Sequence, residues 1–245
     1  MAHELINTQY YSDPNLISYY QFEGSGADTK GVNPGTFVNG PSNGVSFGKF
    51  GMGFSSQGGS SRCDITENTS LALNTFSISC WVGTDSGHTT GEQPIFCRST
   101  NGGGNGYLLC IFAGQINFNY SATSAPTGPQ LYYGTAGQIC DGRMRHVVAV
   151  YDATAASNNM KLYVEGRLVS QANGGAGVHA GTATIGRDPG SAVSNFAWID
   201  DLAFFSRVLT DDEVRDIYSS DRLHGVSPPL GSKGLQVSEL RGGFN

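Results

Sequence analysis

The fold is decided by the stretch from His146 to Tyr218, which contains HVVAVYD (146–152), KLYVEGRLV (161–169), ATIG (183–186) and FAWIDDLAFFSRVLTDDEVRDIY (196–218). The first segment is rich in valine and predicts a buried strand. Glu165-Gly166 separates two apolar runs and indicates a tight β-hairpin, because glycine takes a positive φ without steric cost. The segment 196–205 is the most apolar run of the chain and predicts a central strand.

A short helix is predicted directly after this last strand. Thr210 stands three residues before Glu213, which is the spacing of a capping box. Val214, Ile217 and Tyr218 then fall on one face of the helix.

The rest of the chain alternates short apolar runs with glycine-rich turns. Residues 76–82 place alternate apolar side chains on one face and Trp81 on the other. Ala113-Gly114 is predicted to join two strands as a hairpin. Roughly a dozen such strands predict an all-β fold, in which two antiparallel sheets pack face to face.

The order of these segments resembles the laminin-G-like, concanavalin A-like jelly-roll family. Counterparts of the family's landmarks occur in order at Leu16–Phe22, Gly48–Phe54, Phe76–Val82, His146-Val147, Lys161–Gly166, Ile185-Gly186, Ile199–Leu202 and Arg207–Glu213. The resemblance spans about residues 15–220 and implies a β-sandwich with one short C-terminal helix. Met144 and Ala197 depart from the family, which usually has Trp and Gly there, and both look like packing changes.

Composition bounds the class of protein. A chain of 245 residues can bury a sizeable core as a single domain. Its net charge of −6 argues against nucleic-acid binding, because phosphate contact needs a basic surface. No apolar run approaches the roughly 18 residues that a membrane span needs.

The two ends differ in character from the domain at 16–220. Residues 1–15 have no clear periodicity, and residues 221–245 are rich in Pro and Gly, so both predict extended arms. The first 15 residues carry neither a basic nor an apolar signal region, so no secretory signal is expected.

The cysteines indicate neither a disulfide framework nor a zinc site. Their number is odd, and no two have the Cys-x-x-Cys spacing. We expect Cys80, Cys97 and Cys110, each inside an apolar strand, to be small buried side chains, with a Cys97–Cys110 bridge as an alternative that is not favoured. The five are Cys63, Cys80, Cys97, Cys110 and Cys140.

The glutamates form no catalytic motif. Related sandwich enzymes that cleave glucans use a Glu-x-Asp-x-x-Glu strand, and no glutamate here has that spacing. The pattern His-Glu-x-x-His is also missing from the sequence. His146 is interpreted as a satisfied histidine at a strand start, since no motif sets a nucleophile beside it. The sequence therefore predicts a binding protein and not an enzyme.

Three aspartates are candidates for a structural Ca²⁺ site. In proteins of the resembling family, the aspartate of the first long loop and those of the Ile-Asp-Asp strand can share such an ion, which points to Asp28, Asp200 and Asp201. Calcium requires six to eight oxygen ligands and would offset the repulsion between carboxylates. On a regular strand Asp200 and Asp201 point to opposite faces, so only one would reach the ion. The alternative is that these aspartates cap loops by accepting backbone N–H groups.

Aromatic residues near loop tips are candidates for glycan contact, because sugar rings stack on aromatic faces. Tyr132, Tyr133 and Trp198 are the three that fit. The alternative is that each is a core or sheet-face residue.

Two functions follow. The first is a structural or attachment protein of a virus particle (a phage decoration, head-fibre or tail component), made in the host cytoplasm and touching other subunits through its arms. It rests on the absent signal, the free cysteines, the Pro/Gly arms and the segment Asn15–Tyr19, which is similar to the opening of many predicted phage structural proteins. The alternative is a secreted or cell-surface carbohydrate-binding module of a larger protein. In both, surface glycans are the expected ligand.

Overall fold

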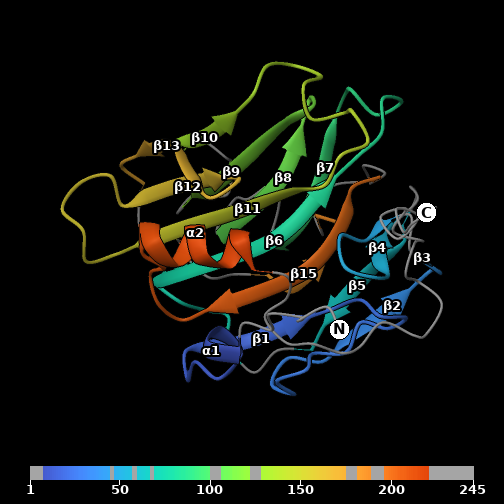
Figure 1. Ribbon diagram of the computed structural model, residues 1–245, viewed down its shortest axis with the longest axis horizontal. Coiled ribbons are helices and arrows are strands. Elements are labelled where there is room, and N and C mark those ends of the chain that lie inside the picture. Colours follow the sequence, from blue (N-terminus) through green and yellow to red (C-terminus); the bar gives the residue numbers. More distant parts are fainter. Residues whose placement is uncertain are drawn as a thin grey trace, which may run out of the picture.

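The computed structural model describes residues 8–44, 47–56, 60–66, 69–99, 106–121, 128–174, 181–188 and 196–220. Two antiparallel sheets pack face to face, and helices lie on the outer side of one of them (Figure 1). The strands are β1 (Leu16–Tyr20), β2 (Gly35–Val38), β3 (Ser42–Gly44), β4 (Gly53–Ser55), β5 (Arg62–Ile65), β6 (Thr75–Gly83), β7 (Glu92–Arg98), β8 (Gly106–Phe112), β9 (Gln115–Ser121), β10 (Gln130–Tyr133), β11 (Arg145–Asp152), β12 (Met160–Val164), β13 (Arg167–Ala172), β14 (Ala183–Ile185) and β15 (Trp198–Phe205). The helices are α1 (Thr8–Tyr11) and α2 (Asp211–Ser219).

The strand order interleaves distant parts of the sequence. One sheet has eight strands, in the order β13-β12-β11-β6-β15-β4-β3, with β1 pairing β15 at its side. The other has seven, in the order β10-β9-β8-β7-β14-β5-β2. The all-β jelly-roll prediction is thereby confirmed.

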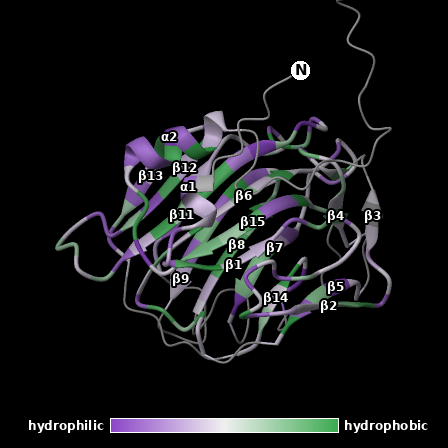
Figure 2. Cartoon of the chain, turned by 60° about the horizontal axis from the view of Figure 1, so that its bottom comes forward, coloured by the Kyte–Doolittle hydropathy of each residue, from purple (hydrophilic) through white to green (hydrophobic). Residues whose placement is uncertain are grey.

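The main core fills the space between the sheets. Along β6, Phe76, Ile78, Cys80 and Val82 all point into it, while Trp81 lies on the opposite face as predicted. Figure 2 shows hydrophobic residues following the central strands and hydrophilic ones mainly in α2 and the connections. The period of two along each strand therefore separates an inner from an outer face.

The outer face of the eight-stranded sheet has a smaller core of its own. Val148 and Val150 of β11 point to this side, where Val214 and Ile217 of α2 cover them. Tyr10 of α1 joins the same cluster and is only 2% exposed. The predicted capping box is present at the start of α2, where Thr210 and Glu213 bond each other's backbone N–H groups.

The expectation of an extended arm at 1–15 is wrong for residues 8–15. These residues form α1 and a turn that pack on the domain, because Tyr10 is apolar enough to enter the outer core and Asp13 finds a cationic partner. Tyr10 also donates a hydrogen bond to the Asp216 carboxylate of α2, at 3.0 Å. Residues 1–7 and the predicted arm at 221–245 lie outside the described residues.

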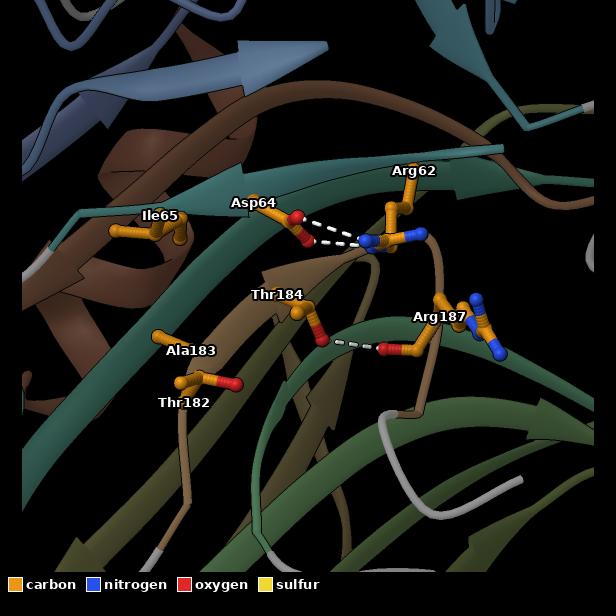
Figure 3. Close-up of a pocket in the computed structure, with 7 residues that line it drawn as sticks. All are labelled: Arg62, Asp64, Ile65, Thr182, Ala183, Thr184 and Arg187. Carbon is orange, nitrogen blue, oxygen red and sulfur yellow. Dashed lines mark hydrogen bonds and ion pairs between the residues drawn. The ribbon is translucent and has the colours of Figure 1, made fainter. Parts of the chain in front are cut away.

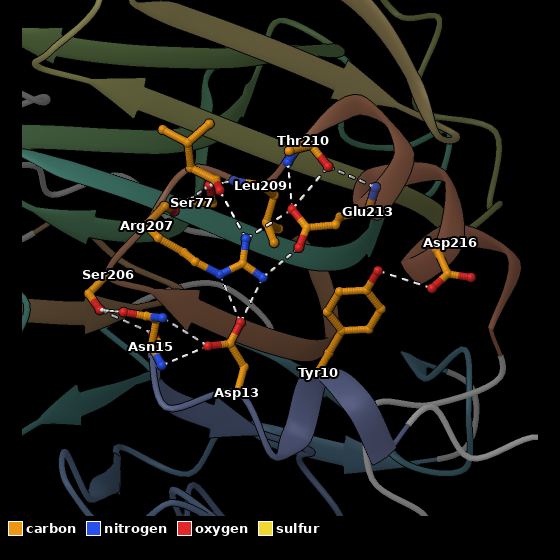
Figure 4. A network of polar contacts seen from close by, with 11 residues as sticks. Tyr10, Asp13, Asn15, Ser77, Ser206, Arg207, Leu209, Thr210, Glu213 and Asp216 are labelled. Atoms are coloured by element: carbon orange, nitrogen blue, oxygen red, sulfur yellow. Dashed lines mark hydrogen bonds and ion pairs between the residues drawn. The ribbon is translucent and has the colours of Figure 1, made fainter.

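A group of ion pairs around Arg207 joins the two ends of the domain (Figure 4). The Arg207 guanidinium lies 2.6 Å from the Asp13 carboxylate and 2.7 Å from the Glu213 carboxylate. Hydrogen bonds from Arg207 lower the pKa of Glu213. Burial alone would raise the pKa of Asp13, but hydrogen bonds from the Asn15 amide and from Arg207 outweigh it and lower that pKa. Both acids are therefore more stable as carboxylates in the folded chain.

We expect Arg207→Gln to lower the free energy of unfolding at pH 7 by about 1–3 kcal/mol, because it removes charge-assisted hydrogen bonds to two carboxylates. The contribution is present above the unfolded carboxyl pKa, about 4, and is lost as the pH falls through the lowered folded values. Urea unfolding at pH 7 and pH 3 measures it. Arg215→Gln is the matched control, since its partner Asp212 on α2 is 87% exposed, and it should change stability by less than about 0.5 kcal/mol. A loss that is equal at both pH values would contradict the argument.

Candidate functional site

The outer face of the seven-stranded sheet mixes polar and apolar side chains, most of which are buried in its central strands. Register pairing places Tyr132, Asn117, Cys110 and Pro94 in one row across β10, β9, β8 and β7. The next row contains Gln130, Asn119, Leu108, Cys97, Thr184 and Asp64. Their neighbours along each strand point inward to the main core, so these side chains point away from it. No helix of the described chain covers this sheet in Figure 1.

A hollow of about 280 Å³ lies on this face, where β5 meets β14. Its lining combines charged and hydroxyl side chains with two small apolar contacts (Figure 3), from Arg62, Asp64, Ile65, Thr182, Ala183, Thr184 and Arg187. In β5 the alternation Arg-Cys-Asp-Ile sends Cys63 and Ile65 into the core, so Arg62 and Asp64 face outward. The same period places Thr184 outward on β14, between two inward residues.

Gly186 explains how Arg187 reaches the hollow. It follows β14 with a φ of +81°, and an added Cβ would lie 2.6 Å from the ring of Phe54. A glycine is thus required both for the turn and for the space. The turn is closed by a hydrogen bond from the Thr184 hydroxyl to the Arg187 carbonyl, at 2.5 Å. The chain leaves the sheet here, and Arg187 comes to lie at the rim beside Arg62 (Figure 3).

The two arginines of the hollow differ in their partners. Arg62 binds the Asp64 carboxylate with both Nε, at 2.5 Å, and Nη2, at 2.9 Å. Arg187 forms no ion pair with a described residue, and its buried Nε–H has no hydrogen-bond partner there. Together the groups offer guanidinium donors, hydroxyls that donate or accept, and carboxylate oxygens that accept. Such a set is suited to binding a polar ligand in a fixed orientation.

Several titratable side chains lie close together on β7, β8 and the turn after β14, beside the hollow. The thiol of Cys97 lies 3.6 Å from the Asp188 carboxylate, and burial raises the pKa of Cys97 and of Cys110. Burial and the nearby Asp188 raise the pKa of Glu92 to about 7. The thiols are therefore protonated and weakly nucleophilic at neutral pH. All five cysteines are free and buried.

A second hollow, of about 270 Å³, lies at the turn between β11 and β12 and includes Asp152, Ser157 and Asn159. Two of its polar side chains, Asp152 and Asn159, are engaged in the turn itself. Asp152 accepts hydrogen bonds from the amide and hydroxyl of Thr154, and Asn159 exchanges two with the backbone of Gly174.

The three aromatic residues proposed as glycan contacts do not come together. Tyr132 is 38% exposed on the outer face of the seven-stranded sheet, five strands from Asp64 or roughly 24 Å at the usual strand spacing. Tyr133 packs against the main core. Trp198 lies in the other sheet, half-buried, with its ring centroid 6.1 Å from that of Phe47. Glycan contact at these residues stays a prediction, and only Tyr132 shares a face with the hollow.

The aspartates proposed as calcium ligands do not share contact partners, because Asp28 and Asp200 bind the backbone of different loops. Asp28 accepts backbone N–H groups from Tyr19, Lys30, Val32 and Asn33, at 2.8–3.1 Å. Asp200 accepts those of Lys49, Phe50 and Asp201, at 2.8–2.9 Å.

Asp201 has a φ of +48° at a bulge in β15, so the regular alternation assumed for the pair does not hold. Among the described residues no group of three or more His, Cys, Asp or Glu side chains could hold a metal ion. The backbone contacts are those of loop-capping aspartates, and calcium binding stays a prediction that this geometry does not support.

His146 has a neighbour that no sequence motif revealed. Its Nε2 lies 2.9 Å from the Ser79 hydroxyl, because β6 and β11 pair with Ser79 opposite Val148 and His146 opposite Trp81. Burial lowers the pKa of His146 to about 3. His146 is 1% exposed and Ser79 2%, so both are closed to substrate. A histidine with so low a pKa is also a poor general base. The pair is therefore part of the packing.

The sequence itself carries a signal for the hollow. The polar–apolar alternation of residues 62–65 predicts Arg62 and Asp64 on one face of a strand. A strand that ends on Gly186 likewise makes Arg187 the first residue off the sheet. Sequence reasoning missed the site because the pairing of β5 with β14 joins segments more than 100 residues apart.

Comparisons with known proteins agree with this architecture. The family model of the concanavalin A-like lectin/glucanases superfamily matches residues 57–215, which is more than half of the chain. No curated protein matches the sequence.

Three similar solved structures are binding domains of botulinum neurotoxins. The serotype D ligand-binding domain in complex with N-acetylneuraminic acid has a TM-score of 0.65 and 17% identity, over 83% of this chain and 50% of that one. The type G receptor-binding domain has a TM-score of 0.64 and 16% identity, over 83% and 51%. The serotype DC binding domain in complex with rat synaptotagmin II has a TM-score of 0.65 and 18% identity, over 85% and 52%.

The chain thus spans about half the length of the structures it matches, and at these identities the likeness shows the fold alone. Neither described helix, of 4 and 9 residues, is long enough to cross a membrane. The match over residues 57–215, together with the two-sheet topology, makes this chain a member of the concanavalin A-like lectin/glucanase superfamily.

Proposed function

We propose that this chain is a non-enzymatic carbohydrate-binding domain and that the hollow between β5 and β14 is its binding site. The observation that carries the proposal is the lining of the hollow, where two arginines, an aspartate and two threonines border one open space. Sugars present closely spaced hydroxyls, each of which donates and accepts, so a mixed set of donors and acceptors suits them.

The rigidity of the lining supports binding. The Arg62–Asp64 pair holds both side chains in a fixed plane and leaves the outer lone pairs of the carboxylate for a ligand. Both strands are internal to the sheet, with β5 between β14 and β2. A site whose groups are already in position loses less entropy when a ligand binds.

Attachment to a surface glycan is the role that this site would serve. Similar solved structures include a receptor-binding domain and a ligand-binding domain in complex with N-acetylneuraminic acid, which supports binding as the function of the fold in this chain too. The proposed setting is a virus particle, and the alternative is an extracellular module. Since residues 8–15 pack on the domain, an N-terminal arm that contacts other subunits would consist of residues 1–7 alone.

We expect Thr182→Trp to abolish glycan binding, because the indole would fill the hollow from an exposed rim position. The matched control is Ser157→Trp, which places the same side chain at an exposed rim position of the second hollow. Binding is measured on a glycan array with the native chain and both variants, and thermal unfolding confirms that each variant is folded.

The outcomes separate the alternatives. Glycan binding that is lost in Thr182→Trp and kept in Ser157→Trp supports the proposed site. The reverse pattern would move the site to the second hollow. A native chain that binds no glycan on the array would overturn the proposed function itself.

A further inference from the structure

We propose that the hollow selects an anionic sugar, with Arg187 as the residue that pairs with its carboxylate or sulfate group. This inference rests on the proposed function and deepens it by naming the class of glycan. It comes from the charges of the lining and from the contacts of Arg187, and not from the aromatic residues suggested by the sequence.

The lining carries one cation in excess. Asp64 neutralises Arg62 through two hydrogen bonds, so that pair contributes little net charge to a ligand. Arg187 lines the same hollow and has no ion pair with a described residue. In a chain with a net charge of −6, an arginine left without a carboxylate partner in a hollow is a distinctive feature.

The Arg187 side chain is also incompletely satisfied. Its Nε–H is buried, and no described group accepts a hydrogen bond from it. A buried donor without an acceptor destabilises the free chain, so a ligand that supplies the acceptor gains more than it would at an exposed arginine. A carboxylate or a sulfate can accept from Nε and from one Nη together, which is the side-on geometry that a guanidinium favours.

The nearby acids leave Arg187 available. Asp188 follows it in the sequence, but this residue is only 1% exposed. Its carboxylate lies against the Cys97 thiol. Asp64 is held by Arg62. The backbone of Arg187 is fixed by the Gly186 turn and by the Thr184 hydroxyl, so its side chain starts from a defined place at the rim.

The test compares pairs of sugars that differ in one anionic group. We would titrate the native chain with the α-methyl glycoside of N-acetylneuraminic acid and its methyl ester, and with galactose 6-sulfate and galactose, using ligand-observed NMR or calorimetry. We expect at least a tenfold preference for the charged member of one pair, falling as NaCl is raised, since an ion pair is screened by salt. The pair that shows the preference identifies carboxylate or sulfate as the group bound.

Variants assign the preference to its residue. Arg187→Gln should remove the tenfold preference, and Arg187→Lys should restore part of it. Arg167→Gln, at an exposed arginine on β13 in the other sheet, is the matched control and should leave the preference unchanged.

Three results would overturn the inference: equal binding of charged and neutral sugars by the native chain, a preference that survives Arg187→Gln, or a preference that Arg167→Gln also removes. Equal binding that Thr182→Trp abolishes would leave the carbohydrate-binding proposal standing. The absence of binding to any array glycan would remove both.

Discussion

Phe76→Ala should lower the free energy of unfolding by about 3–5 kcal/mol, the range for deleting a fully buried phenylalanine. Phe76 is 0% exposed and lies on β6, the strand to which both β11 and β15 pair. Its ring centroid lies 4.6–6.3 Å from those of Tyr107, Phe118, Tyr120, Tyr151 and Phe204. These residues come from both sheets, so a cavity at Phe76 would remove contacts on both sides of the sandwich at once.

The measurement is equilibrium unfolding in urea. Phe112→Ala is the matched control, because Phe112 ends β8 on the outer face and is 42% exposed. We expect the control to cost less than about 1 kcal/mol. If the two variants lost similar stability, Phe76 would not be the centre of the core that its ring contacts indicate.

Gly114→Ala is expected to destabilise the chain by about 2–4 kcal/mol, from two separate causes. Gly114 has a φ of +71° in the turn between β8 and β9, where a residue with a Cβ pays roughly 1 kcal/mol in strain. The added Cβ would also lie 2.4 Å from the Cα of Gly137. That contact is with backbone, which is held by the hydrogen bonds from the Gly137 and Ile139 amides to the turn, so it cannot be relieved by a rotamer change.

Gly31→Ala separates the two causes. Gly31 has nearly the same φ, +72°, but an added Cβ there would meet no atom within 4 Å. It should therefore show the strain alone, at about 1 kcal/mol. Thermal or urea unfolding of the two variants gives the clash at Gly114 as their difference. Equal losses would mean that residues 137–139 move aside to admit the Cβ.

The fold was largely predictable from the sequence, because local patterns decide it. The Glu165-Gly166 hairpin is present, with φ values of +51° and +74°, and so is the Ala113-Gly114 hairpin. Each signal lies within a few residues, where the turn geometry selects the side chain. Alternation along β6 was enough to orient its side chains.

The candidate site was not predictable to the same degree, because it depends on which strands become neighbours. Asp64 and Thr184 are opposite each other only through the pairing of β5 with β14. Asp28 shows the same limit in another form: its four backbone partners are within the sequence range 19–33, yet only the folded loop shows that its carboxylate is occupied. The N-terminal segment was misjudged because α1 has just four residues, too few for a periodic pattern.

The Arg207 ion pairs have a mechanical consequence. β1 pairs with β15 in antiparallel fashion, and Leu16 lies opposite Phe205, so the two strand ends nearest the chain's exits are side by side. Tension applied through the segments before and after the domain would therefore peel β1 from β15 one bond at a time, the weak direction of a sheet. Asp13 and Glu213 meet Arg207 at this point, and Tyr10 bonds Asp216 still closer to the two ends, so these contacts would bear the load before β1 separates. The sandwich would stay closed under such tension for as long as these few contacts hold.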